Sequence, residues 1–434
     1  MNELERIVKL QKEGVARGIC SVCSSSPYVI DAAIEQAVRT DSFVLIEATA
    51  NQVNQMGGYT GMKPAGFRDM VLDRADKLGL PREKIILGGD HLGPVAWKNM
   101  DSGEAMDLAE TLVYEFSRAG YRKIHLDASM PLGEEVTLNT AEIADRTVRL
   151  CLAAEKGYSE YAEGNPGTRP PVYVIGSEVP TPGGSGEEED MSVTGPEDLT
   201  GMIDCFSEKF RDAGLAVWDR VIAAVVQPGV EFGNHSIHDY IRADAEKLTE
   251  TARNLPGIVL EGHSTDYQKR ESLREMVEDG IAVLKVGPAL TFAAREAIYA
   301  LSYIEDELVR TGVTDTAERS DFIALLDKAM TEEPGNWKDH YTSEEPESSF
   351  LRKYSYSDRS RYYMSAPAVK ESLDRLIANL REAEMPMSLI SQYMPAQYRK
   401  IKEGRLAADP EKMITDHVCE VLDDYWYACG LTEK

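Results

Sequence analysis

The sequence contains few cysteines and no long apolar stretch. Its six cysteines are scattered over 434 residues, which is too few for a disulfide framework and typical of a reducing compartment. The first twenty residues carry charges throughout instead of the apolar core of a secretory signal. No later stretch approaches the roughly 18 uninterrupted apolar residues of a membrane span. We therefore expect a cytoplasmic protein that does not enter a membrane.

Acidic residues outnumber basic ones, with 74 Asp and Glu against 47 Lys and Arg. The formal net charge is -27 at pH 7, whereas nucleic acids and anionic membranes attract proteins with a positive surface. We therefore expect neither of them as a partner. The sequence also lacks a G-x-x-x-x-G-K-[ST] phosphate loop and a strand-linked G-x-G-x-x-G. Kinase or dehydrogenase chemistry that depends on a nucleotide accordingly has no support in the sequence.

The chain does contain a repeated alternation of strand and helix patterns. Short apolar, β-branched runs that end in polar residues recur eight times. They are Ile19–Cys23, Phe43–Glu47, Lys84–Gly88, Lys123–Asp127, Val172–Gly176, Arg220–Val226, Gly257–Glu261 and Ala282–Val286. Helical patterns separate them, for example Pro27–Val38, Pro64–Leu78, Gly103–Ala119 and Ala141–Lys156. Eight such units predict a TIM (β/α)8 barrel, because a doubly wound sheet normally stops at about five to seven strands.

The patterns divide the chain into two regions. Residues 1–310 hold the strand and helix units of the barrel, whereas residues 311–434 are expected to be mainly helical and to pack on it. The Gly-, Ser- and acid-rich stretch Thr181–Thr194 is either a lid or an ordinary solvated loop. The aromatic segment Tyr354–Tyr363 is either an interface or core segment, or a lid that brings an arginine to an anion.

In a barrel, catalytic groups come from the C-terminal ends of the strands and the loops after them. Here those positions carry Glu47, Asn51, Asn54, Asp90, His91, Asp127, Ser129, Glu178, Gln227, Glu231, His263, Ser264, Asp266 and Lys285. Two of the seven histidines, His91 and His263, fall among them, each next to glycines that permit a close approach of a ligand. We predict a divalent metal bound by these two histidines and Glu178, with Gln227 as a weaker fourth ligand. Imidazole and carboxylate ligands suit zinc best, with manganese, nickel or cobalt as alternatives.

The other polar strand-end residues are candidates for catalysis and substrate binding. Adjacent residues of a strand point to different sides, so Asp90 can carry protons beside the ligand His91. Lys285 is either the charge partner of the buried carboxylates or a Schiff-base nucleophile, and the charge partner is preferred. Glu178 and Asp266 complete the catalytic candidates. The candidate substrate contacts are Glu47, Asn51, Asp127 and Ser129, and those for a substrate phosphate are Ser264, Thr265, the amide of Gly287 and Arg359.

Three further residues are expected to belong to the core. His125 shares a face of its strand with Asp127 but lies deeper than the rim. Cys20 and Cys23 form a C-x-x-C pair without a second pair. Redox or zinc chemistry is the alternative for these cysteines, and packing is the preferred interpretation.

Nine segments of the chain resemble the GatZ/KbaZ family, whose members are named as subunits of class II D-tagatose-1,6-bisphosphate aldolase. They run from residue 18 to residue 363 and read GICSVCSSSPYVIDAA, IEATANQVNQMGGYTGM, ILGGDHLGP, KIHLDAS, VIGSEVPTPGG, VVQPGVEF, HSTDYQ, LKVGPALTFAAREAI and YSYSDRSRYY. The resemblance implies a TIM barrel related to the zinc-dependent class II aldolases. In those enzymes an Asp-His pair after one strand supplies a proton carrier and a metal ligand, and Asp90 and His91 match that pair.

The resemblance implies three kinds of function. Family members are described as non-catalytic subunits that support a separate aldolase chain, as ketohexose or ketohexose-phosphate 4-epimerases, and as tagatose-6-phosphate kinases. The missing phosphate loop argues against the kinase. We predict a metal-dependent 4-epimerase of D-tagatose, D-fructose or their phosphates, which forms a homo-oligomer. The alternative is a non-catalytic subunit that partners a class II aldolase chain in galactitol, N-acetylgalactosamine or tagatose catabolism.

The predicted epimerase and an aldolase would share one chemistry. Carbon 4 of a 2-ketose is not acidic, because it is β to the carbonyl group. A metal that polarises the carbonyl oxygen and a base on the hydroxyl of carbon 4 can instead break the bond between carbons 3 and 4. If the aldehyde rotates and adds back through its opposite face, the result is epimerisation at carbon 4. If the aldehyde is released, the result is aldolase activity.

Overall fold

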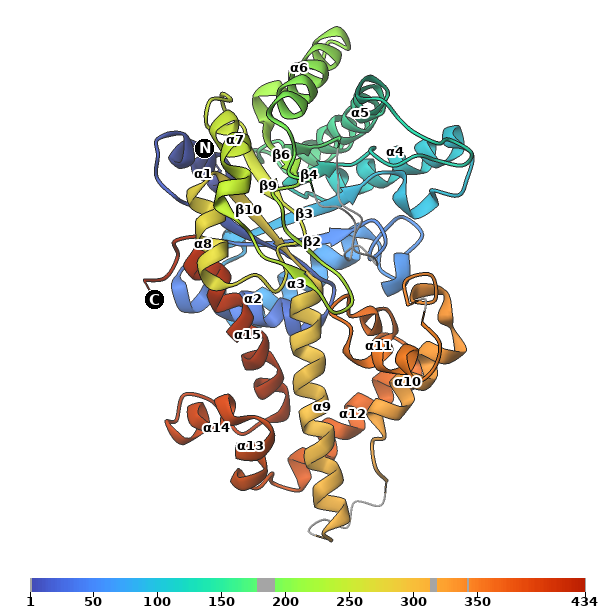
Figure 1. Cartoon of the computed structure of the whole chain (residues 1–434), viewed down its shortest axis with the longest axis vertical. Helices are drawn as coiled ribbons and strands as arrows, with labels where there is room; N and C mark the ends of the chain where they lie inside the picture. The colour runs from blue at the N-terminus through green and yellow to red at the C-terminus, as the bar shows by residue number, and fades with distance from the viewer. Residues whose placement is uncertain (1, 178–191, 313–317, 342, 434) are drawn as a thin grey trace.

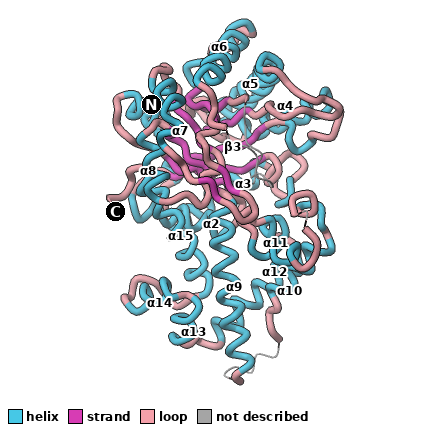
Figure 2. Tube along the Cα trace, in the orientation of Figure 1, coloured by secondary structure: helices cyan, strands magenta, loops and turns pink. Residues whose placement is uncertain are grey.

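The (β/α)8 barrel predicted from the sequence is confirmed. The computed structural model describes residues 2–177, 192–312, 318–341 and 343–433. Eight parallel strands close into a barrel in the order β1-β10-β9-β6-β5-β4-β3-β2 (Figures 1 and 2). The barrel strands are β1 (Ile19–Cys23), β2 (Val44–Thr49), β3 (Ile85–Leu92), β4 (Lys123–Leu126), β5 (Val172–Ile175), β6 (Val221–Val226), β9 (Val259–Gly262) and β10 (Ile281–Val286).

Strand β3 is longer than its sequence pattern indicated. It continues to Leu92 instead of ending at Gly88, so Asp90 and His91 lie within the strand. His91 has a left-handed φ of 45°, which is uncommon for a residue with a side chain. The pairing of β3 with β4 shifts register at the same place, as a bulge does. This bulge sets the directions of the Asp90 and His91 side chains.

Helices cover the outside of the barrel (Figure 1). The helices before and between the barrel strands are α1 (Glu3–Lys12), α2 (Pro27–Thr40), α3 (Pro64–Leu78), α4 (Ser102–Arg118), α5 (Thr140–Gly164), α6 (Pro196–Asp212), α7 (Arg242–Arg253) and α8 (Arg270–Glu278). Helix α3 has the predicted bounds, because proline fits the first turn and Gly79 ends the helix with a φ of 81°. Within the described residues, no helix is long and apolar enough to cross a membrane.

The barrel interior is apolar toward the N-terminal ends of the strands. Helix α1 places Leu4, Ile7 and Val8 in one buried cluster with side chains from the N-terminal ends of the strands. The strand residues of this cluster are Ile19, Leu45, Ile86, Val172, Val174, Ile222, Ala223, Val225, Val259, Ala282 and Val283. The bottom of the barrel is therefore a packed core, and polar side chains enter the interior only nearer the opposite end.

Helix α15 (Pro410–Ala428) takes the place beside the barrel that an eighth barrel helix usually fills. The helix that follows β10 is α9 (Pro288–Arg310), which begins at the barrel and runs away from it (Figure 1). Helix α15 packs against α2, α8 and α9. The hydroxyl of Tyr425 donates to the carbonyl of Thr265 at 2.7 Å, and the indole nitrogen of Trp426 donates to the Ser42 hydroxyl at 3.2 Å. The C-terminal helix is thus part of the helical layer around the barrel.

A second part of the C-terminal region reaches the C-terminal end of the barrel strands. The other helices of this region are α10 (Phe322–Glu332), α11 (Glu347–Tyr354), α12 (Pro367–Glu382), α13 (Met387–Tyr393) and α14 (Pro395–Lys402). Between α11 and α12 lies the short 3-10 helix η6 (Arg359–Tyr363). Asp358 fixes this segment to α9, because its carboxylate accepts hydrogen bonds from Arg295 at 3.1 Å and Thr291 at 2.6 Å. A two-stranded hairpin, β7 (Glu231–Phe232) and β8 (Ile237–His238), accompanies the segment, and the amide of Tyr356 donates to Asn234 in its turn.

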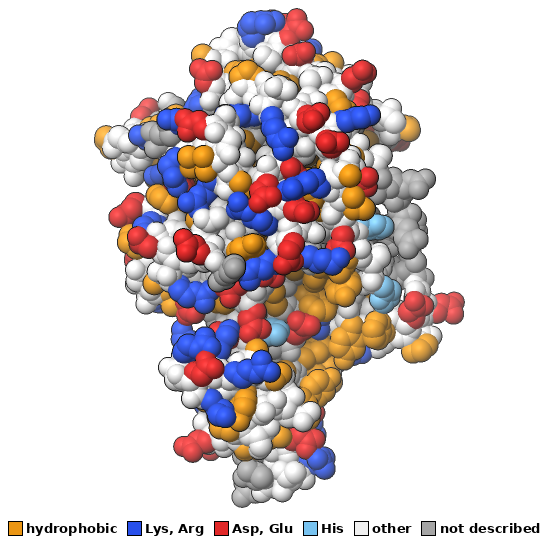
Figure 3. Space-filling view, turned by 60° about the vertical axis from the view of Figure 1, so that its left-hand side comes forward, with side chains coloured by type: hydrophobic (Ala, Val, Ile, Leu, Met, Phe, Trp, Pro, Cys, Tyr) orange, Lys and Arg blue, Asp and Glu red, His pale blue; other side chains and the backbone are white. Residues whose placement is uncertain are grey.

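The helical region leaves part of its apolar surface uncovered. Apolar side chains gather toward the lower part of the face shown in Figure 3, whereas acidic and basic groups alternate over the upper part. Exposed large side chains include Tyr303 on α9 and Phe350 and Tyr354 on α11. Exposed apolar surface alone does not identify a partner, so this area by itself assigns no function.

We expect Trp426→Ala to lower the free energy of unfolding by about 3–5 kcal/mol, the usual cost of emptying a large buried aromatic site. Trp426 is 1% exposed and joins α15 to the loop before β2. The measurement is urea unfolding followed by circular dichroism. Phe350→Ala is the matched control, because Phe350 is 50% exposed and should cost less than about 1 kcal/mol. Equal losses in the two variants would contradict the assigned place of α15.

Candidate functional site

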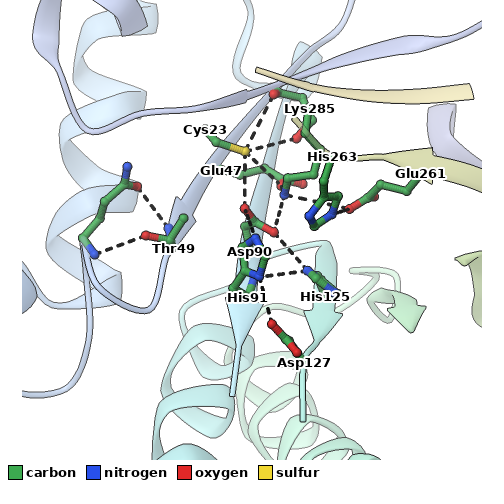
Figure 4. Close-up of polar contacts among 12 residues, drawn as sticks. Cys23, Glu47, Thr49, Asp90, His91, His125, Asp127, Glu261, His263 and Lys285 are labelled. Atoms are coloured by element: carbon green, nitrogen blue, oxygen red, sulfur yellow. Dashed lines mark hydrogen bonds and ion pairs between the residues drawn. The ribbon is translucent and has the colours of Figure 1, made fainter. Parts of the chain in front are cut away.

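A closed ring of opposite charges crosses the barrel interior above its apolar floor. The ammonium group of Lys123 lies 2.7 Å from Glu47 and 2.8 Å from Glu261, and all three side chains are fully buried. Lys285 completes the ring from the other side, at 2.8 Å from Glu47 and 3.8 Å from Glu261. The four residues come from β2, β4, β9 and β10, so this charge ring, Glu47–Lys123–Glu261–Lys285, connects half of the barrel strands. Figure 4 shows three of its members, Glu47, Glu261 and Lys285.

Gly88 on the neighbouring strand makes room for this ring. A Cβ at position 88 would lie 2.5 Å from a carboxylate oxygen of Glu47, which is closer than a stable contact permits. Glycine at this position therefore lets the Glu47 side chain lie flat over β3. A larger residue would displace the carboxylate that both lysines share.

Three imidazole rings lie above the charge ring, toward the C-terminal end of the barrel. The ring centroids of His91, His125 and His263 are 4.9–5.2 Å apart in every pair. Each imidazole also contacts a carboxylate (Figure 4). His91 Nδ1 lies 2.8 Å from Asp127, His125 Nδ1 lies 3.0 Å from Asp90, and His263 Nε2 lies 3.0 Å from Glu261. The strand period of two places His125 above Lys123 and His263 above Glu261.

The charges of these groups follow from their neighbours. Burial opposes ionisation of Asp90, but the charges of His91 and Lys285 outweigh it and hold the pKa of Asp90 well below its usual value. Burial likewise opposes ionisation of Glu261, and the two lysines lower its pKa. Burial disfavours the ammonium of Lys285, yet Asp90 and the other acidic neighbours raise its pKa. A lysine held in its charged form cannot act as a Schiff-base nucleophile, so its role as a charge partner is favoured.

The donor set fits a divalent cation. Asp90, His125, Glu261 and His263 each offer a ligand atom, and these atoms lie within 4.8 Å of one another. The Nε2 atom of His125 is buried and has no hydrogen-bond partner among the described residues. Burial lowers the pKa of His263 to about 3, so its imidazole is neutral, as a metal ligand requires. The carboxylates of Glu47, Asp90, Asp127 and Glu261 outnumber the buried ammonium groups of Lys123 and Lys285, so this part of the barrel attracts a cation.

The structure groups some of the metal ligands predicted from the sequence and separates others. His263 lies within the donor set, and His91 lies beside it with its Nδ1 bonded to Asp127. Glu178 lies outside the described residues. The side-chain oxygen of Gln227 accepts hydrogen bonds from the amides of Gly229 and Val230, at 2.9 and 3.0 Å. Gln227 therefore holds its own loop in this structure.

Two donors that the sequence analysis left out, His125 and Glu261, belong to this set. His125 is fully buried, as expected of a core residue, but it is buried against Asp90 and the other imidazoles. Glu261 lies two positions before His263 and thus shares its face of β9. A charged residue in an otherwise apolar strand was the available signal for Glu261 and also for Lys123.

An open pocket leads from these groups to the surface. Its walls are formed by Cys23, Thr49, Gln52, Tyr59, Asp90, His91, Phe232, His263, Ser264, Asp266, Lys285, Val286, Gly287, Pro288 and Arg361. The two cysteines of the C-x-x-C pair separate here, since Cys20 is buried in the core and Cys23 borders the pocket. The sulfur of Cys23 lies 3.5 Å from Asp90 and 3.6 Å from Glu47, and burial raises the pKa of this thiol.

The predicted phosphate contacts are only partly available. Ser264 and Gly287 border the pocket, but the Gly287 amide donates to Asp266 at 3.0 Å. The same Asp266 oxygen accepts from Ala289 at 2.8 Å, and burial raises the pKa of Asp266 to about 6. Thr265 is fully buried, with its hydroxyl donating to the Lys285 carbonyl.

Arg359 points away from the pocket, and Arg361 borders it instead. The Arg359 guanidinium donates to the carbonyl of Asn336 at 3.0 Å. Arg361, two residues later in η6, is among the pocket residues. The segment Tyr354–Tyr363 contains both arginines, and the sequence analysis chose Arg359 for the phosphate. The tight turn of η6 decides between them, because it sends residues two apart to different sides.

The remaining predicted substrate contacts support other residues of the site. Glu47 belongs to the charge ring, and Asp127 holds His91. The hydroxyl of Ser129 donates to Asp127 at 2.7 Å. Asn51 contacts Tyr59 through its backbone carbonyl, which accepts from the Tyr59 amide at 3.0 Å. None of these four side chains is among the described pocket residues.

The fold and this cluster define a class of protein: a (β/α)8 barrel with a buried, metal-competent group of histidines and carboxylates beneath an open polar pocket. Within that class, the chain belongs to the D-tagatose-1,6-bisphosphate aldolase subunit GatZ/KbaZ-like family, whose model matches residues 4–430. The family resemblance stated from the sequence segments is therefore confirmed.

Two relatives span nearly the whole chain. The D-tagatose-1,6-bisphosphate aldolase subunit GatZ of Klebsiella pneumoniae subsp. pneumoniae is 44% identical over 430 residues, which are 98% of this chain and 99% of that protein. A probable tagatose 6 phosphate kinase from Sinorhizobium meliloti 1021 has a sequence 42% identical to this chain, and its crystal structure matches this structure with a TM-score of 0.84. That match covers 95% of this chain and 100% of the other.

Loss of a residue that only supports a metal ligand usually weakens metal binding by about 10- to 100-fold. We expect His125→Ala and His263→Ala to weaken binding of a divalent metal by more than this, because both residues are proposed ligands. Zinc affinity is measured by competition with a chromophoric chelator, and bound metal by mass spectrometry. His235→Ala is the control, because His235 is exposed beside Phe350. If His91→Ala abolishes metal binding while His125→Ala leaves it intact, the donor set described here is wrong.

We expect the metal-free chain to lose stability as the pH falls below about 5. Burial opposes ionisation of Asp127, but the hydrogen bond and charge of His91 outweigh it and lower the pKa of Asp127. A lowered pKa stabilises the fold above the unfolded value of about 4, and this stabilisation is lost as protons bind below it. Asp127→Asn should therefore reduce the slope of the free energy of unfolding against pH, in the acidic range, by up to about 1.4 kcal/mol per pH unit. Urea unfolding at several pH values tests this, and the exposed Asp374→Asn should leave the slope unchanged.

Proposed function

We propose that the chain serves as a subunit of a class II D-tagatose-1,6-bisphosphate aldolase, supporting a separate catalytic chain. The observation that carries this proposal is the near full-length match to a protein named as such a subunit, at 44% identity over 99% of its length. The family model that matches residues 4–430 bears the same subunit description. Subunits of this kind act in the catabolism of galactitol, N-acetylgalactosamine or tagatose, and we propose the same setting here.

A second function, catalysis by this chain itself, is favoured by the buried charged and polar side chains inside the barrel. A supporting subunit does not need several buried ionised groups beneath an open pocket, because each one costs free energy to remove from water. We propose that the pocket binds D-tagatose, D-fructose or their phosphates and performs aldol chemistry at carbons 3 and 4. Epimerisation at carbon 4 is the proposed outcome.

The described residues suggest how this reaction would proceed. A divalent cation, most suitably zinc, held by Asp90, His125, Glu261 and His263 or a subset of them, would polarise the substrate carbonyl oxygen. An Asp90 carboxylate oxygen would accept the proton of the hydroxyl on carbon 4. The electron pair of the bond between carbons 3 and 4 then passes toward carbon 2, giving an enediolate and an aldehyde. Re-addition of the turned aldehyde reverses these steps, and Asp90 returns the proton.

Lys285 and Asp127 support this chemistry without reacting. Lys285 forms an ion pair with Asp90 and keeps its carboxylate ionised. Asp127 fixes the orientation of His91 through the 2.8 Å hydrogen bond to Nδ1. The pocket walls then need only to hold the sugar hydroxyl groups above these residues.

One experiment with Asp90→Asn separates the two functions. Purified wild-type and variant chains are incubated with D-tagatose, D-fructose and their 6-phosphates, with and without zinc, and the products are separated by chromatography. The same chains are then added to a separate class II D-tagatose-1,6-bisphosphate aldolase chain, whose activity and thermal lifetime are measured. Asp374→Asn again serves as the control, because Asp374 is exposed.

For the supporting function we expect both chains to raise the lifetime and activity of the aldolase equally, since Asn preserves the size of Asp. For catalysis by this chain we expect wild type alone to interconvert the 4-epimers and Asp90→Asn to lose about 10²- to 10⁴-fold in rate. No effect on the aldolase would reject the supporting function. If neither wild type nor Asp90→Asn converts any of the sugars or sugar phosphates, catalysis by this chain is rejected.

A further inference from the structure

Arg361 brings a guanidinium group to the pocket from the C-terminal region. Its Nη1 donates to the carbonyl oxygens of Ser357 and Asp358, and its Nη2 donates to the Tyr362 hydroxyl at 3.0 Å. These bonds occupy three of the five N–H groups of the guanidinium. Within the described part of the chain, the Nε–H and one N–H on Nη2 have no acceptor. Free N–H groups of a guanidinium can donate to the oxygens of a phosphate or carboxylate.

Among the residues that the structure describes, Arg361 also forms no direct ion pair. Lys285, the other permanently charged cation of the pocket, contacts Glu47 and Asp90. Arg295, which contacts the same C-terminal segment, is paired with Asp358 at 3.1 Å. All the described acceptors of Arg361 are uncharged oxygens. An anion in the pocket would therefore meet a cation that is already placed and that no described carboxylate contacts directly.

Neighbouring side chains hold Arg361 in this position. The ring of Tyr362 lies under its guanidinium, 4.5 Å from ring centre to the central carbon. Tyr362 in turn packs edge-on against Tyr59, which belongs to the 3-10 helix η1 (Gly58–Thr60), at 4.8 Å between centroids. The backbone amide of Tyr59 donates to the carbonyl of Asn51 at 3.0 Å. Two loops from distant parts of the sequence thus fix one wall of the pocket.

The N-terminus of α9, the usual alternative for an anion in this fold, is already in use. Barrels commonly bind phosphate at the loops after the last two strands, through amides at a helix start. Here one Asp266 oxygen accepts from the amides of Gly287 and Ala289, at 3.0 and 2.8 Å. A carboxylate of the chain itself therefore occupies the place of a phosphate and would repel a second anion.

We propose that Arg361 determines the preference of this pocket for an anionic ketose, by binding the phosphate at the end of the sugar remote from Asp90. The inference rests on the sugar site proposed above, and it assigns the recognition of the phosphate to the C-terminal region instead of the loops after β9 and β10. Asp90 and Lys285 stand on strands and His263 directly follows β9, whereas Arg361 and Tyr59 stand on segments beyond the strand ends. Because all five residues line the same pocket, a phosphorylated ketose bound there would place its reacting carbons at the strand ends and its phosphate at Arg361.

The test is a set of binding measurements that need no turnover. Isothermal titration calorimetry is carried out with D-tagatose 6-phosphate, D-tagatose and inorganic phosphate on wild type, Arg361→Gln, Arg361→Lys and Arg405→Gln. Arg405 is the control, because it is an exposed arginine just beyond α14 that pairs with Glu403. Thermal unfolding checks that each variant is folded, and Arg361→Lys keeps the charge if Arg361→Gln does not fold.

We expect Arg361→Gln to weaken binding of D-tagatose 6-phosphate by about 10- to 100-fold, as loss of a charge-assisted pair of hydrogen bonds does. D-tagatose should change by less than about twofold, and inorganic phosphate should compete only in chains that retain Arg361. Arg361→Lys should fall between wild type and Arg361→Gln, because lysine keeps the charge but not the paired donors. If wild type binds D-tagatose and its phosphate equally, or if the variants bind the phosphate as wild type does, the inference is overturned and the sugar site stands. Binding of neither sugar by wild type would reject both.

Discussion

The charge ring Glu47–Lys123–Glu261–Lys285 is the constraint on which the rest of the site depends. Each buried ion costs several kcal/mol to remove from water, and only close partners of opposite sign offset that cost. Each glutamate here serves both lysines, so removing any one member would leave buried charges uncompensated. The ring therefore fixes the relative heights of β2, β4, β9 and β10. The imidazoles above the ring follow the same order, because His125 stands two residues beyond Lys123 on β4, and His263 lies two residues beyond Glu261, directly after β9.

The same ring determines the electrostatics of the open pocket. Its two lysines are outnumbered by the four carboxylates of the upper barrel. These carboxylates, the neutral His263 and the Nε2 of His125, which has no partner in the described part of the chain, together suit a divalent cation. Lys285 also extends from the ring to Asp90, whose carboxylate it keeps ionised. A barrel interior filled only with branched apolar side chains would be simpler to stabilise. The charged interior is hence the main argument that this family member binds a ligand itself and is more than a support for another chain.

The C-terminal region contributes to the barrel at two separate places. Helix α15 fills the gap that α9 leaves when it turns away from the barrel, with Trp426 and Tyr425 buried against the loops of β2 and β9. The η6 segment, fixed by the buried pair of Arg295 and Asp358, forms one wall of the pocket. Both contacts explain why the family match extends from residue 4 to residue 430 instead of ending with the last barrel strand.

The sequence by itself determined the eight strands, the helices between them and the family, because each depends on local patterns: apolar runs of strand length, helical periodicity, and polar residues such as Asp90 and His263 where strands end. Only the tertiary structure decided that His125 and Glu261 join the donor set, that Gln227 binds its own loop, and that Arg361 rather than Arg359 meets the pocket. Strand alternation reveals which face a residue shares, but not how far up the barrel it lies, because depth depends on the stagger of neighbouring strands. The paths of η6 and α15 depend on packing against residues more than a hundred positions away, such as Thr265 against Tyr425, and no local pattern carries that information.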